Sequence, residues 1–205
     1  MIKKSIIMRL SLATIVGMSL VAVIIDRFSE TVNLAESFLG FVPWWQQIVA
    51  GTAAGLISAL IAYGLISMPF LRKVNGHYAN MFGRFQLSLS EILFISVCAG
   101  VGEEILFRGA IQPLAGIMLT AVIFVGIHGY LSPYNWRLTI YGAVLTVLMY
   151  GIGYMSQQYG LASAIIAHTV IDAVLLYKLQ HWAGEVDVDE NTSIPDDFSE
   201  DFSQD

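Results

Sequence analysis

Three ionisable residues stand close together in the segment GEEILFRG, which lies within a long apolar stretch. Glu103 and Glu104 are adjacent carboxylates, and Arg108 follows Glu104 at the i,i+4 spacing that puts two side chains on one face of a helix. On such a helix Glu103 is rotated by about 100° from Glu104 and need not face the arginine. The spacing therefore predicts a structural pair between Glu104 and Arg108, and leaves Glu103 as the reactive carboxylate.

Two histidines and an aspartate in later apolar segments suit the same chemistry. His128 ends one segment, and His168 and Asp172 are again at i,i+4, so Asp172 can hydrogen-bond His168. A carboxylate and an imidazole that face each other can activate a water molecule, and a second imidazole can donate to a developing oxyanion. No serine or cysteine in these segments has an evident base beside it. Activated water is therefore the expected nucleophile.

Membrane-spanning helices must position these residues. The chain has 205 residues, of which 56% are hydrophobic and 13% charged, with a mean hydropathy of +0.68. Soluble domains are about a quarter charged. Lipid cannot satisfy an open backbone, and no alternating strand pattern is present, so the apolar segments should be helical. We predict an all-α, polytopic membrane helical bundle of about six transmembrane helices, the first of them uncleaved, at 5–25, 46–68, 90–114, 116–131, 138–156 and 160–180.

The ionisable residues lie at similar depths in the third, fourth and sixth of these segments. At about 1.5 Å per residue, Glu103 and His128 are each about 17 Å from the surface at which their helix enters. His168 and Asp172 are about 12 Å and about 18 Å from theirs. All four therefore lie near the middle of a hydrocarbon core of about 30 Å. Ionisable groups at this depth are costly, so their coincidence predicts a functional site rather than a network that only fixes helix packing.

The distribution of basic residues sets the expected orientation. With six spans, one side of the membrane receives Lys3, Lys4, Arg9, Arg72, Lys73, Arg84, Arg137 and Lys178. The positive-inside rule makes that side cytoplasmic, so we expect a multi-pass protein of the cell membrane with both termini in the cytoplasm. The acidic segment 185–205 lacks apolar periodicity and is predicted to be a disordered cytoplasmic tail.

The second predicted span contains Gly51 and Gly55 at GxxxG spacing. Such a pair can form a dimer contact, but it more often lets neighbouring helices of one chain pack closely. We expect the second arrangement here, and the oligomeric state stays open.

The motifs resemble those of the CPBP family, the CAAX proteases and bacteriocin-processing enzymes that are also called Abi proteins. EEILFRG resembles the family's EExxxR motif, and FVGIH, from Phe124 to His128, resembles its FxxxH motif. HTVID, from His168 to Asp172, is similar to its HxxxN motif except at the last residue. The resemblance divides the chain into an N-terminal two-span region with its loops, a core of four spans and the acidic tail, at 1–87, 88–184 and 185–205.

The resemblance implies an intramembrane endopeptidase that depends on a glutamate. Glu103 and His128 would activate water, and His168 would form the oxyanion hole with the residue at position 172. Glu104, Arg108 and Phe124 would support this site. The expected partners are the lipid bilayer and a peptide or protein substrate, with or without a lipid, such as a CAAX-like tail or a leader peptide. Neither nucleic acid nor a cofactor is expected.

Asp172 is the position at which this sequence departs from the family pattern. Asparagine donates hydrogen bonds, whereas an ionised aspartate only accepts them. Asp172 would therefore act either as a carboxylate that holds His168 in one tautomer, or as a neutral acid that donates to the oxyanion.

Two other functions remain open at this point. A bundle without catalytic activity would serve as a scaffold or regulator of another membrane protein, or as a bacteriocin self-immunity protein. A zinc-dependent membrane protease would use the same side chains, because Glu, His and Asp are all zinc ligands. Zinc is not favoured, since no HExxH pair lies on one helix.

Overall fold

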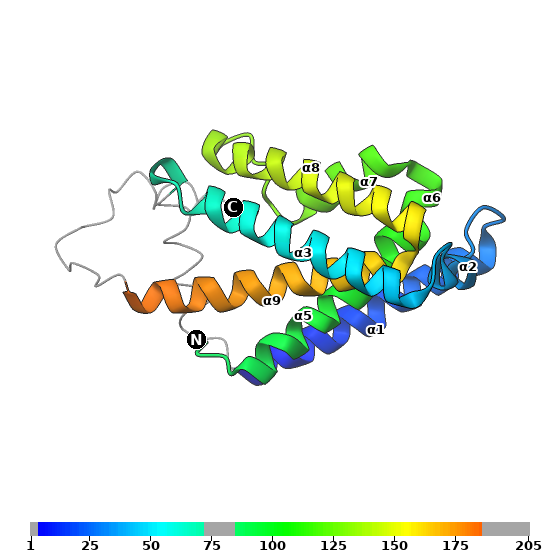
Figure 1. The fold of residues 1–205 in the computed structure, drawn as a ribbon, viewed down its shortest axis with the longest axis horizontal. Helices are drawn as coiled ribbons and strands as arrows, with labels where there is room; N and C mark the ends of the chain where they lie inside the picture. Colours follow the sequence, from blue (N-terminus) through cyan, green and yellow to red (C-terminus); the bar gives the residue numbers. More distant parts are fainter. Residues whose placement is uncertain (1–3, 72–84, 186–205) are drawn as a thin grey trace.

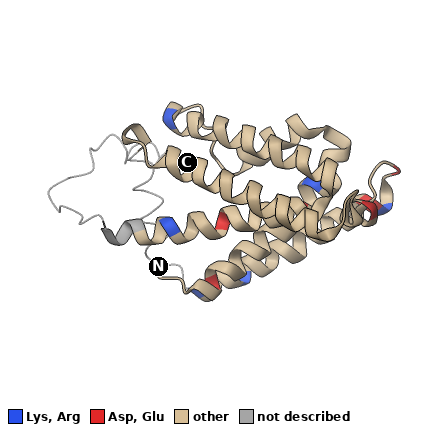
Figure 2. Cartoon of the chain, in the orientation of Figure 1, with Lys and Arg blue, Asp and Glu red and all other residues tan. Residues whose placement is uncertain are grey.

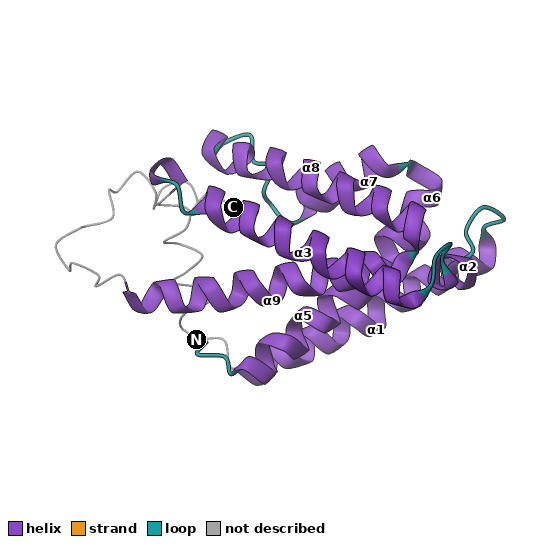
Figure 3. Cartoon of the chain, viewed as in Figure 1, coloured by secondary structure: helices purple, strands orange, loops and turns teal. Residues whose placement is uncertain are grey.

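The structure, a computed structural model, describes residues 4–71 and 85–185, and within these two ranges it contains helices and no strands (Figure 3). The long helices are α1 (Lys4–Phe28), α3 (Trp44–Ile66), α8 (Trp136–Tyr159) and α9 (Leu161–Glu185). The shorter ones are α2 (Leu34–Leu39), the 3-10 helix η1 (Pro69–Leu71), α5 (Leu89–Glu104), the π-helix η2 (Ile105–Ile111), α6 (Gln112–Ala115) and α7 (Ile117–Ile127). The prediction of an all-α bundle is confirmed. Lys3, Arg72, Lys73, Arg84 and the tail from 186 onward lie outside the described residues.

Four of the described helices, α1, α3, α8 and α9, are long and apolar enough to cross a membrane. The predicted span 90–114 is also helical throughout, as α5, η2 and α6 follow one another without a break. The predicted span 116–131 is wrong in its length, because α7 has only 11 residues and ends at Ile127. At about 1.5 Å per residue it is about 16 Å long, half of a hydrocarbon core. The backbone turns at Gly129, where φ is +79°, and the chain reaches α8 without further helix.

Helix α9 lies in the middle of the bundle and packs against α3, α5 and α8 (Figure 1). Two glycines bring α3 close to it: a Cβ on Gly51 would lie 2.5 Å from the carbonyl oxygen of Ser163, and one on Gly55 would lie 2.7 Å from that of Ala167. The GxxxG pair therefore serves close packing within one chain, as expected.

Helix α5, which carries the two glutamates, is held closely between α1 and α9. A Cβ on Gly102 would lie 2.7 Å from the Cα atom of Ile15 in α1. A Cβ on Gly100 would collide with the side chain of Thr169 in α9. These contacts leave α5 little room to shift or rotate, so the direction of the carboxylates that follow is well defined.

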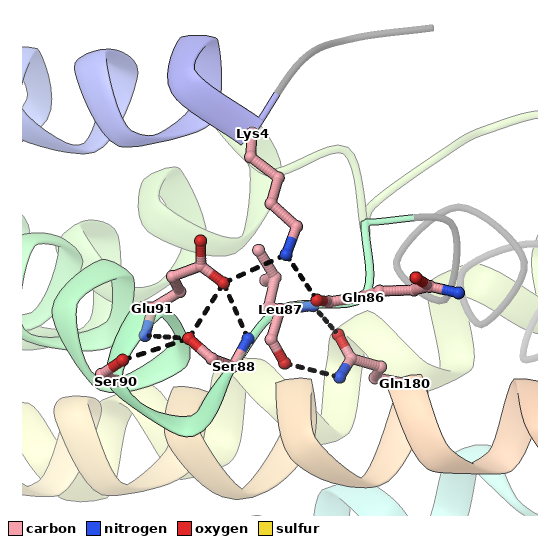
Figure 4. Close-up of polar contacts among 7 residues, drawn as sticks. All are labelled: Lys4, Gln86, Leu87, Ser88, Ser90, Glu91 and Gln180. Carbon is pink, nitrogen blue, oxygen red and sulfur yellow. Dashed lines mark hydrogen bonds and ion pairs between the residues drawn. The ribbon is translucent and has the colours of Figure 1, made fainter.

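Hydrogen bonds join α1, α5 and α9 at the end of the bundle where α1 begins and α9 ends (Figure 4). Gln180 accepts from the backbone N–H of Leu87 at 2.7 Å and donates to the carbonyl oxygen of the same residue at 2.8 Å. The Nζ atom of Lys4 donates to the carbonyl oxygen of Gln86 at 2.6 Å and lies 3.3 Å from Glu91. The two helices that carry the glutamates, His168 and Asp172 are thus tied to each other and to α1 at one end.

Charged residues are sparse along the middle of the bundle (Figure 2). Most large apolar side chains of α1 are exposed, among them Leu10, Val16 and Leu20. Contiguous apolar surface of this extent is unusual for a soluble monomer and suits contact with lipid. The described helices are therefore those of a multi-pass membrane protein.

Candidate active site

All the ionisable residues singled out in the sequence meet in one place. Glu103 and Glu104 end α5, His128 directly follows α7, and His168 and Asp172 lie in the first half of α9. Three elements that are distant in sequence therefore contribute to one cluster, at the depth where α7 ends.

Glu103 lies between the two histidines. Its Oε2 atom is 3.4 Å from Nε2 of His128 and 3.9 Å from Nε2 of His168. Glu103 is 9% exposed, and its Oε2 atom is buried without a hydrogen-bond partner in the described chain. The carboxylate thus faces the imidazoles, as its position on the helix predicted.

Glu104, the next residue of α5, is fully buried. Its Oε2 atom lies 3.1 Å from Nε of Arg108, so the predicted pair is present. Its other oxygen lies 2.8 Å from Nδ1 of His168, a contact that the sequence did not predict. One carboxylate therefore neutralises the arginine and orients a histidine of the site.

Arg108 is enclosed by apolar side chains as well as by Glu104. Its guanidinium carbon lies 4.6 Å from the centre of the Phe124 ring, and an Nη2 N–H points to the sulfur of Met149 at 3.3 Å. Nothing in the sequence of α8 marked Met149 as part of this environment. The side of the site toward η2 is thus closed by buried groups.

The ring of Phe124 packs against both histidines. Its ring centre lies 4.6 Å from that of His128 and 5.6 Å from that of His168, and Phe107 packs edge-on against it at 5.0 Å. The expected supporting role of Phe124 corresponds to these contacts. Tyr130, which the sequence did not single out, stacks on the far side of His128 at 6.4 Å.

The hydrogen bonds of the outer ring nitrogens fix the tautomers of both histidines. Nδ1 of His128 lies 2.6 Å from the carbonyl oxygen of Phe124, which can only accept, so this nitrogen carries a proton. Nδ1 of His168 faces the carboxylate of Glu104 and donates to it for the same reason. In the neutral form of each ring, Nε2 is then an acceptor that points toward Glu103.

Asp172 stands one helical turn beyond His168. Its Oδ2 atom is 3.5 Å from Nε2 of His168, the nitrogen that faces the centre of the site. Both expected roles of Asp172, as a carboxylate that holds His168 in one tautomer or as a neutral acid that donates to the oxyanion, stay predictions. Glu104 lies at Nδ1 of His168, so any contact by which Asp172 orients the ring is made at Nε2.

The site is exposed on one side only. The side chains of His128 and Asp172 are 33% and 29% exposed, while those of Glu104 and Arg108 are buried. Helices α7 and α9 both run toward the end of the bundle where α1 begins (Figure 1). Along α9, Asp172 therefore lies closer to this end than His168 does.

Hydroxyl groups near the cluster are already engaged. Ser96 donates to the carbonyl oxygen of Ile92 at 2.9 Å, and Ser163 donates to that of Gly160 at 2.7 Å. Among the residues that the structure describes, no three His, Cys, Asp or Glu side chains are arranged to hold a metal ion. What the cluster offers chemically is a carboxylate between two oriented imidazoles.

The turn after the glutamates is a π-helix, η2, which separates the paired carboxylates from α6. Short π-helical segments are frequent at functional sites. Here the wide turn contains Arg108 and directs it back toward Glu104.

Comparison with known proteins gives one family match. Residues 85–174 match the model of the family described as type II CAAX prenyl endopeptidase Rce1-like. This segment of the chain is therefore similar to the Rce1-like family. The Rce1-like segment contains every residue of the cluster, from Glu103 to Asp172, together with Phe124 and Arg108. The resemblance drawn from the three motifs is thereby confirmed.

One curated protein also matches part of the chain. The chain is 33% identical over 95 residues to the uncharacterized protein YpbD of Bacillus subtilis (strain 168), and the aligned part is 45% of this chain and 48% of the relative. The chain thus spans about half the length of the curated relative it matches. No solved structure matches it.

Proposed function

We propose that this protein is an intramembrane endopeptidase in which Glu103 and His128 activate a water molecule to cleave a peptide bond. The observation that carries the proposal is the convergence of Glu103 Oε2 with the Nε2 atoms of His128 and His168, at 3.4 Å and 3.9 Å, inside an apolar bundle. The Rce1-like family supports a protease of the CAAX type.

Water activation requires an acceptor for the proton of water. Glu103 Oε2 and His128 Nε2 are two such acceptors, side by side, and the fixed tautomer of His128 keeps its lone pair inward. The water oxygen forms a bond to the carbonyl carbon while its proton passes to Glu103. The carboxylic acid then returns this proton to the departing amine as the C–N bond breaks.

His168 is the group proposed to stabilise the oxyanion. Carboxylates flank both ring nitrogens, Glu104 at Nδ1 and Asp172 at Nε2, so the ring can carry a proton on each. The Nε2–H bond would then point into the site, where negative charge develops on the carbonyl oxygen. Glu104 and Arg108 act as positioning residues in this scheme, since they touch His168 and one another rather than the substrate.

Water and substrate are proposed to enter from the end of the bundle where α1 begins and α9 ends. Non-helical backbone at membrane depth is tolerated where it lines a water-filled space, and residues 128–135 are such a segment next to His128. Lys4, Arg137 and Lys178 belong to helix ends on this side, which we therefore assign to the cytoplasm. The substrate is a peptide or protein at the membrane, with a CAAX-like tail or a leader peptide.

Comparison of membrane peptides tests the proposal. Cells that produce the wild-type protein, Glu103→Gln or the control Glu30→Gln are compared by mass spectrometry; Glu30 is exposed and remote from the site. One precursor should accumulate uncleaved with Glu103→Gln and with no other variant. Identical peptides in all three strains would overturn the protease and favour the non-catalytic scaffold or self-immunity protein.

A further inference from the structure

The cluster contains more acid than base. Its carboxylates are Glu103, Glu104 and Asp172, and its single permanent cation is Arg108. With neutral imidazoles the formal charge is −2, from three carboxylates and one guanidinium. Protonation of both histidines would only bring it to zero. In neither state is the site positively charged, so it offers no net attraction for a carboxylate of a substrate.

Asp172 is a carboxylate without a permanently charged partner among the described residues. Within residues 4–71 and 85–185 its only ion-pair partner is His168, at 3.5 Å. Arg108 is occupied by Glu104, and Lys178 on the same helix lies over the ring of Tyr63 at 5.7 Å. At 29% exposed, the Asp172 side chain stands on the open side of the cluster. A group that enters from this side therefore meets an accessible negative charge next to the reacting centre.

Hydrogen-bonding capacity gives an independent argument. With neutral rings, the atoms that converge on the centre are all acceptors: Glu103 Oε2, Asp172 Oδ2 and the Nε2 atoms of both histidines. Glu103 Oε2 is buried, in a residue that is 9% exposed, and has no hydrogen-bond partner among the residues that the structure describes. One water molecule supplies two donors and leaves acceptors unmatched, whereas an ammonium group supplies three and a guanidinium five.

We propose that Asp172 recognises a lysine or arginine side chain of the peptide substrate, next to the bond that is cleaved. Membrane segments carry their lysines and arginines at the cytoplasmic surface, the side from which this site is proposed to open. A substrate that enters there brings such a side chain to Asp172, while Glu103 and His128 remain free to hold water. The inference rests on the proposed function, and it gives Asp172 a role that an asparagine would not have.

Binding of a simple cationic probe tests the recognition apart from any cleavage. The purified protein in detergent is titrated with dodecylamine, which is a primary ammonium near neutral pH, or with dodecanol, and the thermal unfolding midpoint is followed. Dodecylammonium should raise the midpoint of the wild type and of Glu30→Gln, with an apparent affinity about tenfold weaker in Asp172→Asn, because a charge-assisted hydrogen bond is lost. Dodecanol should have no comparable effect. Equal affinity in wild type and Asp172→Asn would overturn the proposal.

Cleavage of matched peptides separates this inference from the proposed function. Peptides that differ only in Lys, Gln or Glu on either side of the scissile bond are incubated with the protein in liposomes. The wild type should prefer Lys to Gln and Gln to Glu, and Asp172→Asn should lose most of this preference. A uniform change of rate in Asp172→Asn, with the preference intact, would refute recognition and favour a neutral Asp172 that donates to the oxyanion. If no peptide is cleaved but dodecylammonium binding depends on Asp172, the protease fails and the recognition of cations stands.

Discussion

Glu104→Gln removes one charge from an ion pair that has no contact with solvent. The side chains of Glu104 and Arg108 are 0% and 1% exposed, and the charged atoms are 3.1 Å apart. At an effective dielectric constant of about 20, two charges at this distance attract by about 5 kcal/mol. Removing one partner of a buried pair costs about 3–5 kcal/mol, because the other charge remains buried. The N–H groups of Arg108 and His168 each face one oxygen of Glu104, whereas a glutamine amide has only one oxygen to accept from both. We therefore expect the free energy of unfolding to fall by about 3–5 kcal/mol.

Thermal unfolding in detergent, followed by tryptophan fluorescence, measures this loss. For a chain of this length each kcal/mol corresponds to about 2–4 °C, so the midpoint of Glu104→Gln should lie about 10 °C below that of the wild type. Glu103→Gln is the matched control, since it makes the same chemical change one residue earlier. Glu103 Oε2 makes no hydrogen bond, so that midpoint should stay within about 3 °C. Equal losses in the two variants would refute the division of roles between the glutamates.

A double-mutant cycle identifies the pair as the cause. Arg108→Met alone leaves the carboxylate of Glu104 buried without its arginine, whereas Glu104→Gln together with Arg108→Met removes both charges. The double variant should be more stable than the sum of the single losses predicts, by about 2 kcal/mol. Additive losses would mean that the two residues stabilise the fold independently, against the 3.1 Å contact.

The remaining predictions concern the metal, the packing and the orientation. Cleavage should survive thorough chelation, because a carboxylate and an imidazole suffice to activate water; activity lost on chelation and restored by zinc would support the metal alternative. Gly55→Ala should lower the unfolding midpoint, since its Cβ would lie 2.7 Å from the carbonyl oxygen of Ala167, whereas Gly64→Ala on the same helix has open space and should be neutral or stabilising. Reporter fusions after Arg72 and Lys178 should read cytoplasmic and one near Glu36 external; an external signal at either of the first two would contradict the assigned orientation.

The sequence predicted which residues meet, because a membrane restricts helices to one direction. Once the apolar segments are known, the position of a residue along its segment gives its depth, and depth alone brought together Glu103, His128 and His168. The i,i+4 spacing of Glu104 and Arg108 likewise fixed their contact within one helix. These predictions needed only local geometry and the thickness of the bilayer.

Contacts that depend on the rotation of one helix against another were not predictable in the same way. The bond from Glu104 to His168 forms only at one rotation of α5 about its own axis relative to α9. Gly100 and Gly102 allow the close packing of α5, but their presence in the sequence does not predict that rotation. Met149 beside Arg108 and the stacking of Tyr130 on His128 are of the same kind. The length of α7 was misjudged because hydrophobicity continues past Ile127, while Gly129 and the polar segment after it end the helix.

The contact of Glu104 with two partners links the stability of the bundle to the chemistry of the site. The carboxylate that keeps Arg108 neutralised is the same one that holds the proton of His168 on Nδ1 and turns Nε2 toward the centre. A change at Glu104 should therefore reduce stability and cleavage together, whereas a change at Glu103 should reduce cleavage alone. Two adjacent glutamates that look equivalent in the sequence thus differ in their partners. Glu103 faces the Nε2 atoms of both histidines, whereas Glu104 contacts a buried guanidinium and Nδ1 of His168.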